Sequence, residues 1–224
     1  MKINTYCINL ARRPDRRYAT EQECLREGFS PQFIDAIDGA QLDTFPSCAK
    51  VSAGEYACGM SHRLAWQHIL DSGGPCALVL EDDVRFESGF TESVEAAMRD
   101  LNDAWDVLYP GYHYAQVEGV INARACCGRA AATHAYCVTR NVCRDLLREY
   151  DPLVVAVDVF LYNHARLRRV LLTPRTAFQR GDDSDISDGR VTDVTTLVPV
   201  EHGADMMDVR YVIGTNVSGG KDTP

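Results

Sequence analysis

Three consecutive carboxylates follow an apolar run in the first half of the chain. Residues 77–84 read ALVLEDDV, and the continuous hydrophobic character before Glu81 predicts a strand that is buried on both faces. Like charges at this spacing repel one another, so a divalent cation or a bound ligand is the expected compensation. Ligand sites of open α/β sheets lie at such strand ends. The alternative is a solvated acidic turn that leaves a core strand.

Four arginines gather in a second segment, residues 9–17, which reads NLARRPDRR and follows a strand-like stretch at residues 3–8. Asp15 is predicted to cap a helix that runs to about Glu27 and stops at Gly28. Cations oppose the dipole at a helix N-terminus unless they bind an anion there. The segment therefore predicts an anion site, with a diphosphate as the natural guest, and a solvated basic face is the alternative.

Asp158 is a third residue that could do chemistry. It follows the apolar residues 153–157 and precedes residues that suggest a short helix, so it is predicted to be that helix's N-cap. Capping alone is the alternative role. The neighbouring pair Ser61-His62 does not predict a serine hydrolase, because adjacent residues on a helix do not face each other. His62 is interpreted as a hydrogen-bonded core histidine.

The elements that must position these residues alternate between strands and helices, which predicts a single α/β domain with a mainly parallel sheet. Residues 110–128 are predicted to be a long connection, either a lid on the acceptor side or a plain surface excursion. The remaining predicted strands are 32–39, 105–109, 133–138 and 168–173, and the predicted helices are 52–71, 88–101 and 141–150.

Composition limits the class of protein. The chain has 224 residues, of which 46% are hydrophobic and 25% charged, so one substantial core is expected. The net charge of −9 argues against a nucleic-acid partner but not against one bound nucleotide. No apolar run approaches the roughly 20 residues that span a bilayer. Nine cysteines without a C-x-x-C pair, and no signal-like N-terminus, favour reduced thiols and a cytoplasmic location. A position at the inner face of the membrane is the alternative.

The last 44 residues differ in character from the rest. Residues 181–224 contain nine acidic and three basic residues with few periodic apolar positions. This pattern is typical of irregular structure, and it lacks a basic amphipathic helix that would dock to an anionic membrane. Residues 187–224 are therefore interpreted as an irregular extension of a domain formed by residues 1–186.

Six short motifs follow one another along the chain: INLARRPDR at 8–16, GMSH at 59–62, VLEDDV at 79–84, THAY at 133–136, VD at 157–158, and Pro174, Gln179 and SDI at 184–186. In their order and spacing, these motifs resemble glycosyltransferase family 25, which contains bacterial lipooligosaccharide galactosyltransferases and collagen galactosyltransferase domains. The resemblance implies a GT-A fold, a Rossmann-like mixed sheet flanked by helices that binds a nucleotide sugar with Mn²⁺ or Mg²⁺. It also implies inverting transfer of a hexose, usually galactose from UDP-galactose, to a glycan acceptor.

The resemblance also assigns roles to residues. Glu81 and Asp83 would coordinate the metal, since they lie on the same side if the backbone stays extended, and Asp82 would point to the ribose or support the site. Asp158 would accept the proton of the acceptor hydroxyl, and His62 and His134 would be structural. The residues implied around the uridine and diphosphate are Asn9, Arg12, Arg16, Ala36 and Gly39, with Gln179 and Ser184 closing over the diphosphate.

Two rival interpretations remain. The donor could be UDP-glucose or a UDP-N-acetylhexosamine, because motif spacing does not reveal the few pocket groups that select hydroxyls. The second rival interpretation is a catalytically degenerate module that binds a nucleotide without turnover. The complete acidic triplet and Asp158 argue against this module.

Overall fold

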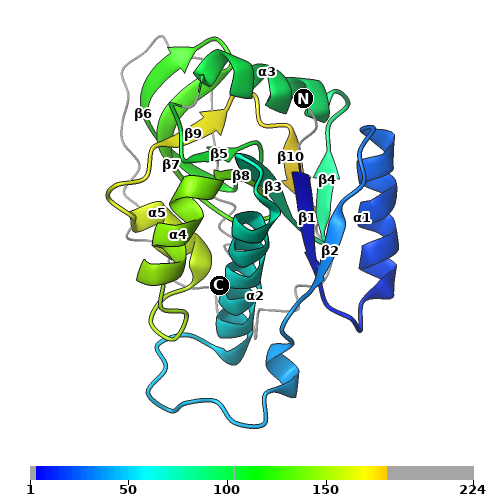
Figure 1. Cartoon of the computed structure of the whole chain (residues 1–224), viewed down its shortest axis with the longest axis vertical. Helices are drawn as coiled ribbons and strands as arrows, with labels where there is room; N and C mark the ends of the chain where they lie inside the picture. The colour runs from blue at the N-terminus through cyan, green and yellow to red at the C-terminus, as the bar shows by residue number, and fades with distance from the viewer. Residues whose placement is uncertain (1–3, 103, 181–224) are drawn as a thin grey trace, which may run out of the picture.

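Eight strands form one mixed sheet in the computed structural model of this chain, which describes residues 4–102 and 104–180 (Figure 1). Their order across the sheet is β2-β1-β3-β8-β5-β9-β7-β6, and β4 (Val84–Phe86) pairs separately with β10 (Ala177–Gln179). The strands of the main sheet are β1 (Asn4–Asn9), β2 (Gln32–Asp35), β3 (Cys76–Glu81), β5 (Val107–Tyr109), β6 (Tyr114–Asn122), β7 (Ala125–Ala131), β8 (Ala135–Thr139) and β9 (Arg169–Leu172).

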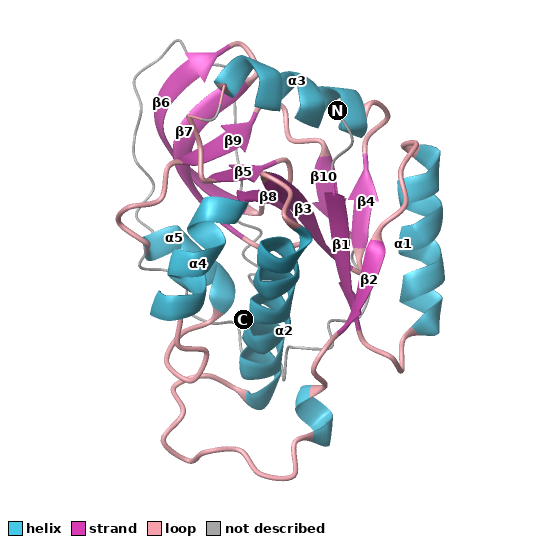
Figure 2. Ribbon diagram, in the orientation of Figure 1, coloured by secondary structure: helices cyan, strands magenta, loops and turns pink. Residues whose placement is uncertain are grey.

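Helices cover both faces of this sheet (Figure 2). Along the sheet's central strands, side chains alternate between two cores, as the two-residue period of a strand requires. Tyr6 and Val79 join one core with Trp66 and other helical residues, while Cys7 and Leu78 join the second. The first core contains α2 (Ala53–Ser72), α4 (Arg140–Glu149) and α5 (Val157–Asn163), and the second contains α1 (Pro14–Arg26) and α3 (Phe90–Leu101).

The predicted mixed α/β architecture is confirmed, but the expectation of a mainly parallel sheet is wrong. Only β1-β2, β1-β3 and β5-β9 are parallel, whereas β3-β8, β5-β8, β6-β7 and β7-β9 are antiparallel. The prediction failed because residues 110–128, interpreted as a connection, belong largely to the hairpin of β6 and β7. Two residues join these strands, which forces them to run antiparallel, since a parallel pair needs a crossover of a dozen or more.

Two helix starts also differ from the prediction. The N-cap of α1 is Arg13 and Pro14 opens the helix, so Asp15 lies in the first turn, where it accepts a hydrogen bond from Arg13. The N-cap of α5 is Ala156, so Asp158 also lies in a first turn. Both carboxylates still favour the positive end of the helix dipole, which explains why they resembled caps.

Helix α2 begins as predicted, one residue after Ser52. The Ser52 hydroxyl accepts from the Glu55 backbone, and the Glu55 carboxylate accepts from the Ser52 backbone, which completes a capping box. Gly73 ends the helix in a left-handed conformation with φ of 75°, which glycine adopts without steric cost. In the described residues, no helix combines the length and the hydropathy needed to cross a membrane.

Candidate active site

The carboxyl ends of three adjacent parallel strands meet at one edge of the sheet. Strand β1 lies between β2 and β3, and all three run in the same direction. The chain therefore leaves neighbouring strands on both sides of β1 at the same edge, which is where open α/β sheets bind ligands. The loops that leave this edge carry the arginines after β1, residues 36–38 after β2 and the acidic residues after β3.

A cleft of about 430 Å³ opens at this edge, between these loops and the first half of α2. We call it the strand-end cleft. Asp158 does not line it, Asn9 lies behind it bonded to Asp82, and Ser184 lies outside the described residues. The predicted residues that line the cleft are Arg12, Arg16, Ala36, Gly39, Glu81, Asp82, Asp83 and Gln179.

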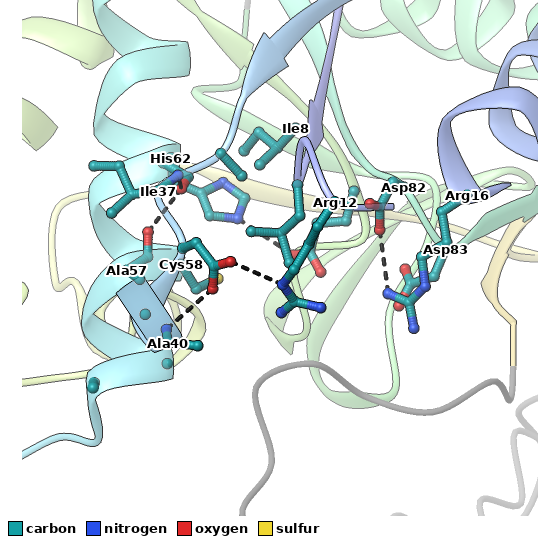
Figure 3. Close-up of a pocket in the computed structure, with 18 of the residues that line it drawn as sticks. Ile8, Arg12, Arg16, Ile37, Ala40, Ala57, Cys58, His62, Asp82 and Asp83 are labelled. Atoms are coloured by element: carbon teal, nitrogen blue, oxygen red, sulfur yellow. Dashed lines mark hydrogen bonds and ion pairs between the residues drawn. The ribbon is translucent and has the colours of Figure 1, made fainter. Parts of the chain in front are cut away.

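Figure 3 shows the cleft with Cys58 and His62 of α2 on one side, Asp82 and Asp83 on the other, and Arg12 between them. Residues far apart in the sequence are therefore brought to one cavity. This grouping needed three loops and a helix, and no single motif could have predicted its shape.

Residues 81–83 form what we call the acidic turn. Asp82 links this turn to the loop after β1. It is 7% exposed, and its two carboxylate oxygens accept from Asn9 Nδ2 at 2.7 Å and from Arg16 at 3.3 Å. Burial raises the pKa of Asp82, and the bonds from Asn9 and Arg16 oppose that rise. Asp82 therefore contributes an internal ion pair, and its role toward a bound nucleotide stays a prediction.

Asp83 has one carboxylate oxygen that no described residue satisfies. Its Oδ2 accepts from Gln179 Nε2 at 2.7 Å, whereas Oδ1 is buried and has no hydrogen-bond partner in the part of the chain that the structure describes. Burial, followed by the charge of Glu81, raises the pKa of Asp83 to about 7. A buried carboxylate oxygen without a partner is costly, and a hard divalent cation is the kind of ligand that would satisfy it.

Glu81 is held by two donors at the end of β3. Its Oε1 accepts from Thr133 Oγ1 at 2.6 Å and lies 3.3 Å from His62 Nε2. Burial raises the pKa of Glu81, but the bonds from His62 and Thr133 outweigh burial and leave this pKa below its ordinary value. Glu81 lies beside Asp83 in a set of oxygen ligands that fits Mg²⁺ or Mn²⁺.

The backbone between these carboxylates is not extended, contrary to the assumption made from the sequence. Strand β3 ends at Glu81, and Asp82 and Asp83 form a turn before β4. A turn lets all three carboxylates line the cleft. Alternation along a strand therefore does not distinguish the metal ligands Glu81 and Asp83 from Asp82. The predicted difference in their roles rests on the hydrogen bonds that each residue makes.

Residues 9–17, which we call the arginine loop, supply the positive charge of the cleft. Arg12 bonds to Asp38 at 2.8 Å, and Asp38 also accepts from the Ala40 backbone to cap the short 3-10 helix η1 (Gly39–Gln41). A Cβ at Gly39 would lie 2.7 Å from the Ala53 carbonyl oxygen, so only glycine lets η1 pack against the start of α2. These contacts join the loops after β1 and β2 into one wall.

The core interpretation of His62 is confirmed. Its Nδ1 lies within hydrogen-bond distance, 3.0 Å, of the Tyr136 hydroxyl, and this hydroxyl accepts a hydrogen bond from Trp66 Nε1 at 2.9 Å. The neighbouring Ser61 hydroxyl donates to the Ala57 carbonyl oxygen and accepts from the Ile37 backbone. Ser61 is therefore structural, consistent with the absence of a predicted hydrolase motif.

Asp158 lies outside the cleft but within electrostatic reach of it. Burial raises its pKa, the Val159 backbone bond to its Oδ1 opposes that rise, and the charge of Glu81 adds to it. A raised pKa suits a carboxylate that accepts a proton. The role of Asp158 as a base stays a prediction.

Two residues support the site through contacts that the sequence reasoning did not predict. Arg180 donates from its backbone to the Asp83 carbonyl oxygen at 2.6 Å, and its guanidinium donates to the Thr20 hydroxyl at 2.8 Å. Because these partners are a backbone oxygen and a distant hydroxyl, the contacts of Arg180 are not visible in any local pattern. Thr133 belongs to the quoted THAY motif, but its bond to Glu81 required the structure.

Comparisons with known proteins agree with the sequence motifs. The sequence profile described as "Glycosyltransferase family 25 (LPS biosynthesis protein)" matches residues 2–119. The chain is 32% identical over 183 residues to a bovine "Probable inactive glycosyltransferase 25 family member 3", covering 70% of this chain and 30% of that protein. It is 30% identical over 132 residues to a mouse "Procollagen galactosyltransferase 2", covering 50% of this chain and 21% of that protein.

The matched region is thus under a third of the length of these curated relatives. Among solved structures, the chain is similar to "A197 from STIV", with 11% identity, a TM-score of 0.44, and coverage of 81% of this chain and 96% of that one. The sequence profile spans more than half of the chain and includes the arginine loop, the GMSH segment and the acidic turn. The chain belongs to glycosyltransferase family 25.

Proposed function

We propose that this chain is an inverting glycosyltransferase that moves a hexose from a UDP-sugar to a glycan acceptor hydroxyl with the help of Mn²⁺ or Mg²⁺. The observation that supports this most is the buried Oδ1 of Asp83 beside Glu81, which has no hydrogen-bond partner among the described residues, in a cleft that also contains Arg12 and Arg16. Galactose is the proposed sugar, because relatives are named galactosyltransferases. Lipooligosaccharide or another surface glycan, made in the cytoplasm, is the proposed product.

The acidic turn would manage the leaving group. When the glycosyl phosphate bond breaks, negative charge develops on UDP, and a divalent cation held by Asp83 and Glu81 would supply Lewis-acid stabilisation of that charge. Arg12 and Arg16 would add positive charge to the same cleft. Gln179, which holds Asp83 through a hydrogen bond, would keep the carboxylate oriented toward the cleft.

The nucleophile's proton needs a separate acceptor. In an inverting transfer the acceptor oxygen bonds to the anomeric carbon as the bond to phosphate breaks, and the hydroxyl proton goes to a base on the opposite face of the sugar. Asp158 is the proposed base. Its position outside the donor-binding residues and its raised pKa support this assignment.

The alternatives named from the sequence remain distinct candidates. A different UDP-hexose would use the same cleft and metal. A nucleotide-binding module without turnover gains support from relatives whose names include "inactive". Turnover separates this module from a transferase, and the identity of the accepted donor separates the enzyme candidates from one another.

The decisive experiment is a panel of nucleotide sugars with Mn²⁺, scored by UDP release with and without glycan acceptors. We expect release from UDP-galactose above the other donors, and more release when an acceptor is present. Equal or greater release from another donor would replace galactose in the proposal. Nucleotide binding without release from any donor and acceptor pair would favour the inactive module.

Asp158→Asn tests the base separately from binding. We expect Mn²⁺-dependent UDP affinity within about twofold of the original chain, and transfer reduced at least about 100-fold, in the range of general base catalysis. Asp151→Asn, on the exposed loop before α5, is the matched control and should leave transfer unchanged. Full transfer by Asp158→Asn would mean that another group is the base.

A further inference from the structure

A thiol, an imidazole and a carboxylate converge on the α2 side of the strand-end cleft. Cys58 and His62 are four residues apart on α2, so they share one face of the helix, and Glu81 approaches from the end of β3. The ligand atoms of these three residues all lie within 4.8 Å of one another. All three residues line the cleft, which gives an ion access from solvent.

The spacing is close to that of a tetrahedral zinc site. Bonds of about 2.0–2.1 Å to nitrogen and oxygen at a tetrahedral angle place those two ligand atoms about 3.4 Å apart. His62 Nε2 and Glu81 Oε1 are 3.3 Å apart. With a bond of about 2.3 Å, the sulfur of a tetrahedral site lies about 3.6 Å from each of the other two ligand atoms, so the Cys58 sulfur, which lies within 4.8 Å of both, needs an inward shift of about 1.2 Å at most.

The groups behind the three ligands are already arranged to orient them. His62 Nδ1 lies 3.0 Å from the Tyr136 hydroxyl, so its other nitrogen, Nε2, is directed toward Glu81. Thr133 donates to the Glu81 carboxylate at 2.6 Å. Hydrogen bonds of this kind orient metal ligands in zinc proteins. With the proton on Nδ1, donated to the Tyr136 hydroxyl, His62 would bind the ion through Nε2 in place of its contact with Glu81.

The chemistry of the ligands selects the ion. Thiolate and imidazole favour Zn²⁺ over Mg²⁺, Mn²⁺ or Ca²⁺, which prefer sets made of oxygen alone. The other side of the cleft offers such an oxygen set, in Asp83 and the shared Glu81. The two sides of one cavity therefore suit two classes of cation.

We propose that Cys58, His62 and Glu81 form a Zn²⁺ site with three protein ligands and one open position on the α2 wall of the strand-end cleft. Because Glu81 belongs to both ligand sets, bound Zn²⁺ removes it from the set that includes Asp83. Zn²⁺ therefore inhibits metal-dependent UDP binding. This last consequence rests on the proposed function, whereas the zinc site itself does not.

Cobalt titration tests the site directly. The full chain, reduced and stripped of metal by a chelator, is titrated with Co²⁺ alone while its absorption spectrum is recorded. We expect tetrahedral Co²⁺ bands in the visible and a thiolate-to-cobalt charge-transfer band in the near ultraviolet, saturating at one ion per chain. Zn²⁺ should then displace Co²⁺ and bleach both features.

Single substitutions assign the ligands. Cys58→Ser should remove the charge-transfer band and weaken Zn²⁺ binding at least about tenfold. The loss of a residue that only hydrogen-bonds to a metal ligand already weakens metal binding by about this factor, so the loss of a ligand should cost at least as much. Cys48→Ser changes an exposed cysteine outside the cleft and should leave the spectrum unchanged. Since His62 is fully buried and its replacement could unfold the chain, Glu81→Gln is the second ligand variant and should also weaken Zn²⁺ binding.

The possible outcomes are separable. A thiolate band that persists in Cys58→Ser, or no such band in the original chain, would overturn the zinc site. If the band is present and Zn²⁺ lowers Mn²⁺-dependent UDP affinity in the original chain but less in Cys58→Ser, the shared use of Glu81 is supported. Zn²⁺ that binds without changing UDP affinity would overturn that sharing. Absence of any UDP binding would contradict the proposed function and leave the cobalt result standing.

Discussion

The two halves of the sheet differ in where the ends of their strands lie and in how the residues at those ends are bonded. In the near half, strands β1, β2 and β3 are parallel, and the residues at their carboxyl ends bond to one another across elements, as Asp82 does to Asn9 and Arg16. In the far half, strands β5, β6, β7 and β9 include the antiparallel pairs β6-β7 and β7-β9, and Val120 and Ile121 of the hairpin are exposed. Antiparallel neighbours send their carboxyl ends to opposite edges.

The direction of the strands therefore decides where charge gathers. Parallel strands deliver several loops to one edge, so one cavity receives carboxylates, amides and arginines from distant parts of the sequence. Among the described strands of the far half, only the pair β5-β9 is parallel, and the antiparallel pairs β6-β7 and β7-β9 send their carboxyl ends to opposite edges. Four experiments test this contrast.

Asp83→Asn should have the largest effect. It removes the charge of a carboxylate whose Oδ1 has no partner among the described residues, so Mn²⁺-dependent UDP affinity should fall at least about 1,000-fold, or about 4 kcal/mol. Isothermal titration calorimetry with Mn²⁺ and UDP measures this change. Asp106→Asn, in the far half, is the matched control and should bind UDP normally. Equal affinity for UDP in Asp83→Asn and the original chain would contradict the role in Mn²⁺-dependent UDP binding that we propose for the near half.

Arg16→Met should destabilise the fold by about 3 kcal/mol, because it leaves the Asp82 carboxylate buried without its cation. Urea unfolding measures the loss. The double variant Arg16→Met with Asp82→Asn should recover part of it, since the unpaired charge is gone. Costs that simply add in the double variant would show that the two side chains do not act as a pair.

Gly128→Ala should act on the far half alone. A Cβ at this position would collide with the Gln116 carbonyl oxygen of the neighbouring strand β6, and such overpacking costs about 2 kcal/mol. Thermal unfolding should shift downward while UDP affinity stays within about twofold. A parallel loss of UDP affinity would mean that the two halves are not independent.

Acidification should reveal the smallest effect, at the pair of Asp106 and Arg168. Burial raises the pKa of Asp106, but hydrogen bonds from the Arg168 side chain and backbone outweigh burial and lower this pKa overall. The pair therefore stabilises the fold above the unfolded pKa of about 3.9, and the stabilisation disappears as pH falls through the lower folded pKa.

The magnitude should be about 0.5–1 kcal/mol, because Arg168 is 57% exposed. Urea unfolding of the original chain and Asp106→Asn at pH 7 and pH 3 measures it. The difference between the two proteins should shrink at pH 3. A difference that grows on acidification would contradict the sign of this argument.

Local patterns predicted the near half well. The capping box at Ser52, the apolar strand before Glu81 and the arginine loop each have a signal that depends on neighbouring residues, and the residues that they contribute line one cleft. The hairpin of residues 114–131 was missed, because β6 is a half-exposed edge strand with many polar residues. The contacts of Arg180 and Thr133 were missed because their partners lie far away in the sequence.

Arg180 has a consequence for the order in which the protein matures. Its guanidinium reaches Thr20 across 160 residues of chain, and its backbone holds the turn at Asp83. Contacts of such high sequence separation form late, because the intervening loop must close first. A nascent chain that has emerged only as far as residue 119, the end of the matched family profile, contains the arginine loop and the acidic turn. It does not yet contain Arg180 and its contacts. Completion of the cleft therefore awaits synthesis of residues 179 and 180, which links competence of the site to near-completion of translation of the described domain.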